Sequence, residues 1–164
     1  KRWQKNEVDG CLRWWWMERA IKEITSSKEL SNLYQDIAKQ LLQETALKNQ
    51  EYLFLAALEK SLIFLADEIY EKFPEQDSID ITSLSLAAKW KLLSNNKVIE
   101  NLIIQETNTN GVLDLIDFYQ SALLLPKNNN LISSDNNISL KKLNELLDKS
   151  YRWSDLLRKT LDEC

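Results

Sequence analysis

The sequence has no histidine and only two glycines among its 164 residues. General acid–base catalysis most often uses histidine, and activated serine or cysteine nucleophiles usually depend on one. A phosphate-binding loop needs glycines so that backbone amides can approach the ligand, whereas Gly10 and Gly111 are isolated. These absences argue against catalysis, so we expect a protein that is not an enzyme and binds no cofactor.

Cysteine is equally scarce. Cys11 and Cys164 lie near opposite ends of the chain, without a CxxC pair and without a histidine to complete a zinc site. We therefore expect no metal site. Two cysteines in a leucine-rich chain are more often free thiols in a reducing compartment than a disulfide, which favours a cytoplasmic protein. A disulfide between the two is the alternative.

Long apolar runs and an excess of positive charge are missing as well. Glu59 and Lys60 interrupt the longest apolar stretch, so the sequence predicts no transmembrane segment. The net charge of −4 gives no overall attraction to nucleic acid. The charge is uneven, because residues 1–22 carry six basic and three acidic side chains, whereas residues 23–77 carry five and eleven.

Leucine dominates what is present. It occupies 29 positions against three for valine, and prolines number only two, so helix formers are plentiful and the β-branched and turn residues of sheets are few. A chain of this length can bury a sizeable core in one domain. We predict an all-α protein, with residues 1–164 forming a single domain of five to seven helices.

The centre of this bundle is predicted at residues 51–73. Leu53 and Phe54, with Ile63 and Phe64, extend the apolar surface of this stretch beyond one stripe, and a helix that is apolar on most sides is usually buried. Its main stripe follows a spacing of three or four residues: Tyr52, Leu55, Leu58, Leu62, Leu65, Ile69 and Phe73.

Capping residues and turn signals set the other boundaries. Asp9 is placed to cap a first helix, and Ser26 with Glu29 forms a capping box that starts a second helix near Ser27. The polar interval 43–50 predicts a break between the second helix and the central one.

The second half of the chain has similar signals. Pro74 ends the central helix, because the residue before proline avoids the helical region. Thr82 or Ser83 can cap a helix that extends to Leu93. Two turns come after it in the sequence, at residues 94–96 and 108–111.

The last part of the chain is a polar loop followed by an amphipathic helix. Residues 126–138 are rich in asparagine and predict a flexible loop. Ser139 can cap the final helix, which could pack on the bundle or on a partner. Its apolar face consists of Leu140, Leu143, Leu146, Leu147, Tyr151, Leu157 and Leu161, with Trp153 at the edge.

Two groups of acids are candidates for a chemical site. Asp67, Glu68 and Glu71 lie within one helical turn, and Asp114 and Asp117 are three residues apart. Neighbouring acids on a helix usually form a solvated face, and no ExxH pattern indicates a di-iron site. We therefore assign neither group a catalytic or metal-binding role.

Nucleic-acid binding is the alternative function. Residues 81–105 have the size of a helix-turn-helix, with Ala88 and Val98 spaced as its core residues and Lys89, Lys91 and Lys97 nearby. The turn lacks the usual glycine, so the motif is degenerate. The basic, tryptophan-rich N-terminal segment could also hold a single strand by stacking.

The N-terminal segment is the strongest indication of function. Trp14, Trp15 and Trp16 are consecutive, so they cannot all face one core, and on a helical projection Trp15 falls among charged residues. Tryptophan and arginine are enriched at interface hot spots. The predicted partner-binding residues are Trp15, Arg19, Lys22, Arg13 and Trp3.

Trp15 has two alternative roles: a neighbouring segment of the chain could cover it, or it could help the N-terminal segment to associate with a membrane surface. We favour a helical protein-interaction or assembly module that is part of a larger protein or of a multi-protein complex. Its partner is another protein or a second copy of the chain, bound through the N-terminal helix.

Overall fold

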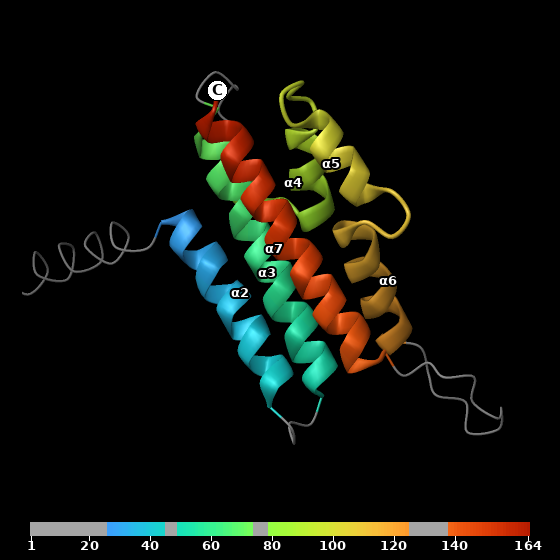
Figure 1. The fold of residues 1–164 in the computed structure, drawn as a ribbon. Coiled ribbons are helices and arrows are strands. Elements are labelled where there is room, and N and C mark those ends of the chain that lie inside the picture. The colour runs from blue at the N-terminus through green and yellow to red at the C-terminus, as the bar shows by residue number, and fades with distance from the viewer. Residues whose placement is uncertain (1–25, 45–48, 74–78, 125–137) are drawn as a thin grey trace, which may run out of the picture.

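The computed structural model describes residues 26–44, 49–73, 79–124 and 138–164. These residues contain α-helices, one short 3-10 helix and no strand, which confirms the predicted all-α class (Figure 1). The elements are α2 (Ser27–Gln43), α3 (Gln50–Glu71), η1 (Ile81–Ser83), α4 (Leu86–Leu93), α5 (Glu100–Thr107), α6 (Val112–Leu124) and α7 (Leu140–Asp162).

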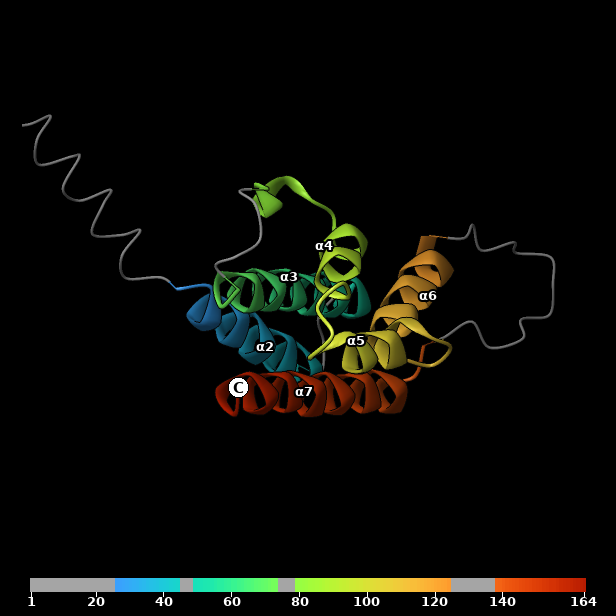
Figure 2. The same cartoon turned by 90° about the horizontal axis from the view of Figure 1, so that it is seen from above.

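The three long helices α2, α3 and α7 run side by side, and the three short helices α4, α5 and α6 cover the side of this bundle that faces away from α2 (Figures 1 and 2). Helix α3 contacts α2, α4, α6 and α7, which makes it the centre of the fold. None of the helices in the described ranges has an apolar stretch of the length that a membrane span requires.

The central helix is buried as predicted. Its core residues are Phe54, Leu55, Ala57, Leu58, Ser61, Leu62, Leu65, Ala66, Glu68 and Ile69. Two apolar residues of the first turn depart from the prediction, because Tyr52 and Leu53 are 41% and 45% exposed. The Tyr52 hydroxyl donates to the Leu123 carbonyl at 2.6 Å, so this ring lies on the surface beside α6. The helix ends at Glu71, three residues before Pro74.

Helices α2 and α3 are separate, as the polar interval predicts. The Ser26 side chain accepts a hydrogen bond from the Glu29 amide at 3.2 Å and so caps α2 at the predicted position. Asn49 adopts a left-handed conformation with φ of 61°, and Gln50 begins α3. The Gln50 side chain donates to the carbonyls of Leu41 and Glu44, which ties the two helix ends together.

The start of α4 differs from the prediction. Neither Thr82 nor Ser83 caps it; the cap is Ser85, whose hydroxyl accepts from the Ala88 amide at 3.3 Å. The reason is that Asp80 caps a different helix just before it. The Asp80 carboxylate accepts from the Thr82 amide at 3.0 Å and begins the 3-10 helix η1. The chain then becomes extended at Leu84 and only afterwards enters α4.

Helix α7 packs on the bundle, which resolves one of the two alternatives for the C-terminal helix. Ser139 caps it as predicted, accepting from the Lys142 amide at 3.3 Å. Trp153, predicted at the edge of the apolar face, is buried: its indole N–H donates to the Leu102 carbonyl at 3.1 Å. Its ring also lies 4.5 Å from that of Trp90, so α7 and α4 meet through aromatic side chains.

Candidate functional site

The predicted partner-binding residues Trp3, Arg13, Trp15, Arg19 and Lys22 all lie outside the described residues. So do the helix predicted after Asp9, Cys11 and nearly all of the asparagine-rich loop. Their roles stay predictions. Cys164 is exposed and forms no disulfide within the part of the chain that the structure describes.

The clustered acids of α3, Asp67, Glu68 and Glu71, are each engaged by another side chain. Glu68 is buried, and both of its oxygens accept hydrogen bonds from the Arg158 guanidinium at 2.8 to 3.2 Å. The Asp67 carboxylate pairs with the buried ammonium of Lys89. Glu71 accepts from the Ser27 hydroxyl at 2.7 Å. The prediction of a solvated face is therefore wrong for Asp67 and Glu68.

Each of these three acids faces a different neighbour of α3: Asp67 faces α4, Glu68 faces α7 and Glu71 faces α2. Successive residues of a helix differ by about 100° in direction, which lets one helical turn reach several neighbours. Within the four described ranges, no group of three or more acidic or cysteine side chains could hold a metal ion.

The predicted helix-turn-helix is present as two short helices, but its details differ from what DNA binding requires. Val98, expected in the shared core, is 48% exposed, and Ile99 takes the fully buried position instead. Lys89 is buried against Asp67, so its ammonium is not available to contact the phosphate groups of a nucleic acid. Lys91 and Lys97 are exposed. The nucleic-acid hypothesis now depends mainly on the N-terminal segment, which lies outside the described residues.

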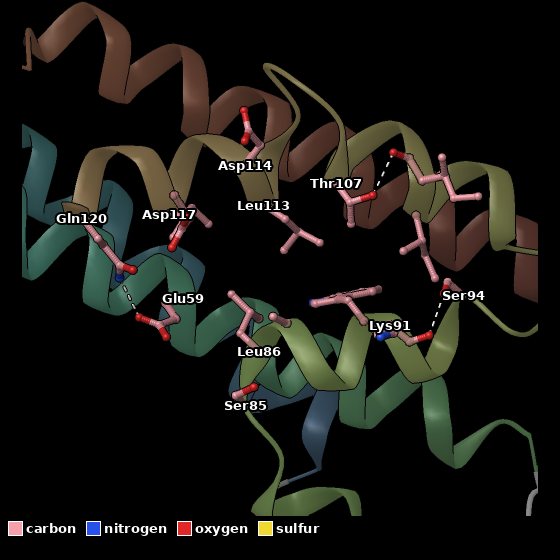
Figure 3. Close-up of a pocket in the computed structure, with 15 residues that line it drawn as sticks. Glu59, Ser85, Leu86, Lys91, Ser94, Thr107, Leu113, Asp114, Asp117 and Gln120 are labelled. Carbon is pink, nitrogen blue, oxygen red and sulfur yellow. Dashed lines mark hydrogen bonds between the residues drawn. The ribbon is translucent and has the colours of Figure 1, made fainter. Parts of the chain in front are cut away.

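A cavity of about 620 Å³, called the groove, opens between α4, α5 and α6 (Figure 3). Leu86 of α4 and Leu113 of α6 point into it from opposite sides. Its full lining is Glu59, Ser85, Leu86, Ala87, Trp90, Lys91, Ser94, Ile103, Ile104, Thr107, Leu113, Asp114, Ile116, Asp117 and Gln120.

Carboxylates outnumber cations along the groove. Its lining includes three acids, Glu59, Asp114 and Asp117, and one base, Lys91. Glu59 accepts a hydrogen bond from the Gln120 amide at 2.7 Å, and Asp114 accepts from the Asn110 backbone at 3.0 Å. Asp117 is exposed and makes no hydrogen bond or ion pair with the described residues. Asp117 is therefore the groove acid whose carboxylate has no partner among the described residues.

Trp90 supplies the buried wall of the groove. It is fully buried, and its indole N–H has no hydrogen-bond acceptor among the described residues. A buried donor without a partner costs about 1–3 kcal/mol relative to a satisfied one. Native proteins keep few such groups. The groove thus combines apolar walls with the exposed carboxylate of Asp117, while the unpartnered donor of Trp90 is buried beneath the wall.

Another hollow, of about 670 Å³, lies between α2 and α7. Its lining mixes charges of both signs, including Lys39, Asp148 and Arg152, and none of the residues that line it has a buried polar side-chain atom without a partner. It is therefore a weaker candidate than the groove, despite its similar volume.

The sequence does not predict the groove, because the residues that line it come from four helices. Asp114 and Asp117 are recognisable as a pair, but their spacing alone predicts only a solvated face. Trp90 falls on an apolar helix face, which is correct for the ring. The unpartnered indole N–H is a property of the packed structure, and no sequence pattern signals it.

Comparison of the chain with models of protein families, with curated proteins and with solved structures gives no match.

Proposed function

We propose that the chain is a non-enzymatic protein-interaction or assembly module that acts in the cytoplasm as part of a larger protein or complex. The observation that supports this best is the groove, in which apolar side chains lie beside the exposed carboxylate of Asp117. A polypeptide offers both complements at once: apolar side chains and a lysine or arginine.

The chemistry of the remaining acids fits a binding role better than a catalytic one. Asp67 and Glu68 are committed to ion pairs with Lys89 and Arg158, so neither is poised to exchange protons with a substrate. The described residues that line the groove include no nucleophile activated by a neighbouring base, which is the arrangement that covalent catalysis requires.

The N-terminal residues Trp15, Arg19 and Lys22 form the second proposed contact. If Trp15 contacts a partner, its replacement by alanine leaves the melting temperature nearly unchanged and weakens partner binding or self-association. The measurement is a thermal melt together with chemical cross-linking of the native complex, followed by identification of the cross-linked peptides. Phe118→Ala, which removes an exposed aromatic side chain of α6 that does not line the groove, is the matched control.

A large drop in the melting temperature of the Trp15→Ala protein would show that Trp15 belongs to the core instead. Cross-links that map neither to the groove nor to the N-terminal segment would contradict the proposed contacts.

A further inference from the structure

We propose that an apolar flank of α2 is the docking site of the N-terminal segment of the same chain, residues 9–24, which folds back along α2 as an antiparallel helix. This flank, called the α2 stripe, consists of Leu30, Leu33, Tyr34, Ile37 and Leu41. The inference goes beyond the proposed function, because it concerns a contact within one chain and needs no partner.

Helix α2 buries the less apolar of its two sides. Its buried residues are Ser31, Gln35, Ala38 and Leu42, so only one of them has a large apolar side chain. The α2 stripe lies roughly 100° round the helix from these residues. All of its members are exposed or half-buried, and Leu33 is 51% exposed. Since an amphipathic helix turns its apolar stripe towards a packing partner, the α2 stripe indicates a second partner for this helix.

The α2 stripe faces away from α7. Lys39 and Gln43 lie on the opposite flank of α2 and line the hollow against α7. On the side of the stripe, the ring of Tyr34 stacks on the half-buried ring of Phe64 in α3, with the centroids 5.6 Å apart and 17° between the planes. Figure 2 shows α7 on one side of the pair formed by α2 and α3. The stripe and Phe64 therefore form an apolar face on the other side of that pair.

Residues 9–24 have an apolar face of matching length. Asp9 is placed to cap a helix in this segment. On a helical projection, one side of that helix carries the large apolar side chains Trp14, Met17, Ile21 and Ile24. These side chains span about 15 Å along the helix axis, and the α2 stripe spans about 17 Å. An antiparallel arrangement would place Ile24 beside Leu30 and Trp14 beside Leu41.

The connection to α2 favours the same chain over a second copy. The backbone at Ser26 is extended, with φ of −71° and ψ of 156°, so a helix that ends at Ile24 cannot continue straight into α2. Only Thr25 and Ser26 separate the two, and helices joined by so short a loop pack side by side and antiparallel. A short tether also gives the segment an effective concentration on the order of millimolar. A second copy would have to compete at its much lower concentration in solution.

Docking in this orientation leaves the opposite side of the segment exposed. Trp15, Arg19 and Lys22 lie on that side, roughly 150° from the centre of the apolar face. The residues proposed to contact a partner would therefore be held on the surface of the bundle, pointing away from α2.

The native Cys11 makes this contact testable in the full chain. A nitroxide spin label is attached to Cys11 in a chain that carries Cys164→Ser, and the loss of amide NMR signals along α2 is measured. In the antiparallel arrangement Cys11 lies near the C-terminal end of α2. The signals of residues 39–43 should therefore lose the most intensity, and those of residues 28–31 the least.

The variant that tests the stripe is Leu33→Asp, which places a charge in the contact and should abolish the signal loss at residues 39–43. The control is Leu156→Asp in α7, because Leu156 is similarly exposed, at 47%, and lies outside the stripe. This control should retain the signal loss. Circular dichroism melts show that each variant is folded, and Leu33→Ala replaces Leu33→Asp if that protein does not fold.

The inference is overturned if the signal loss is absent, or if it is largest at the N-terminal end of α2. Signal loss that persists in the Leu33→Asp protein would equally rule out the stripe as the docking site. A mixture of spin-labelled chains with isotopically labelled chains that lack the spin label tests for a second copy, and signal loss in that mixture would contradict docking within one chain. None of these results bears on the proposed function, which cross-linking of the native complex tests separately.

Discussion

Leu62 lies at the centre of α3 and is completely buried. Replacing it with alanine removes apolar contacts and leaves a cavity, so we expect the free energy of unfolding to fall by about 2–5 kcal/mol. Urea denaturation followed by circular dichroism measures this change. Lys60→Ala, at an exposed position of the same helix, should change the stability little. A loss below about 0.5 kcal/mol for Leu62→Ala would contradict the burial of α3.

Gly111 shows how a single missing side chain shapes the junction of α5 and α6. A Cβ atom at this position would lie 2.3 Å from the backbone oxygen of Glu106. Since backbone cannot move aside as a flexible side chain does, Gly111→Ala should destabilise the fold by about 1–3 kcal/mol. Thermal unfolding measures it, and Thr109→Ala, at an exposed neighbouring position, serves as the control. Equal stability of the two variants would contradict this close approach.

Asp80 makes the start of η1 sensitive to pH. Hydrogen bonds from the Thr82 side chain and then from the Thr82 backbone favour the carboxylate and lower the pKa of Asp80 below its ordinary value of about 3.9. Because the folded pKa is the lower one, the contribution of Asp80 to stability is present above that ordinary value. It is lost as the pH falls through the folded pKa.

A carboxyl-detected NMR titration should therefore place the Asp80 midpoint below that of a model peptide. In the Thr82→Ala protein, which loses the side-chain donor, the midpoint should move back towards the ordinary value. An unchanged midpoint in that variant would show that the Thr82 hydroxyl does not set the pKa.

Among the elements, α3 and α7 are joined by the buried pair of Glu68 and Arg158. Glu68→Gln leaves the guanidinium without its counter-charge, so we expect a loss of about 3–5 kcal/mol in the free energy of unfolding. The double variant Glu68→Gln with Arg158→Met should recover much of this loss, because both charges are then gone.

The matched comparison for this pair is Lys72 and Asp162, an exposed ion pair between the C-terminal end of α3 and α7. Lys72→Ala should cost at most about 1 kcal/mol, since exposed ion pairs contribute little. A double-mutant cycle in chemical denaturation gives both coupling energies. Similar values for the two pairs would show that burial does not strengthen the contact of Glu68 with Arg158.

The boundaries of elements were predictable where a cap has a further signal beside it. Ser26 and Ser139 cap their helices as the sequence predicts. The spacing of Ser26 to Glu29 distinguishes it from the neighbouring hydroxyl residues Thr25 and Ser27. At the start of α4 the sequence offers several hydroxyl residues, and Asp80 captures the Thr82 amide first. The choice between Thr82 and Ser85 therefore depends on how the preceding loop folds, which periodicity does not reveal.

Contacts between elements were much less predictable. The sequence places Asp67 and Glu68 on one helical turn, but their partners Lys89 and Arg158 lie 22 and 90 residues further along the chain. Nothing in the spacing of acids indicates which base they will meet. The same limit applies to the groove, since Leu86, Ile104 and Leu113 become neighbours only after α4, α5 and α6 have packed.

At the scale of the whole molecule, the sequence indicates one of the two candidate surfaces, and only the packed structure shows the other. The N-terminal segment stands out by composition, because three consecutive tryptophans beside arginines are visible in any sequence. The groove stands out by geometry, because the residues that line it come from elements far apart in the sequence.

The helices that surround the groove differ in how many of their residues are buried. Helix α5 forms one wall, yet it is only eight residues long and contributes a single buried residue, Ile103. Short helices with little buried surface open locally at a smaller free energy than the core does. A segment bound between α4, α5 and α6 would oppose that opening and would restrict the backbone freedom of α5. Binding to the groove would therefore also stabilise the helix that encloses it.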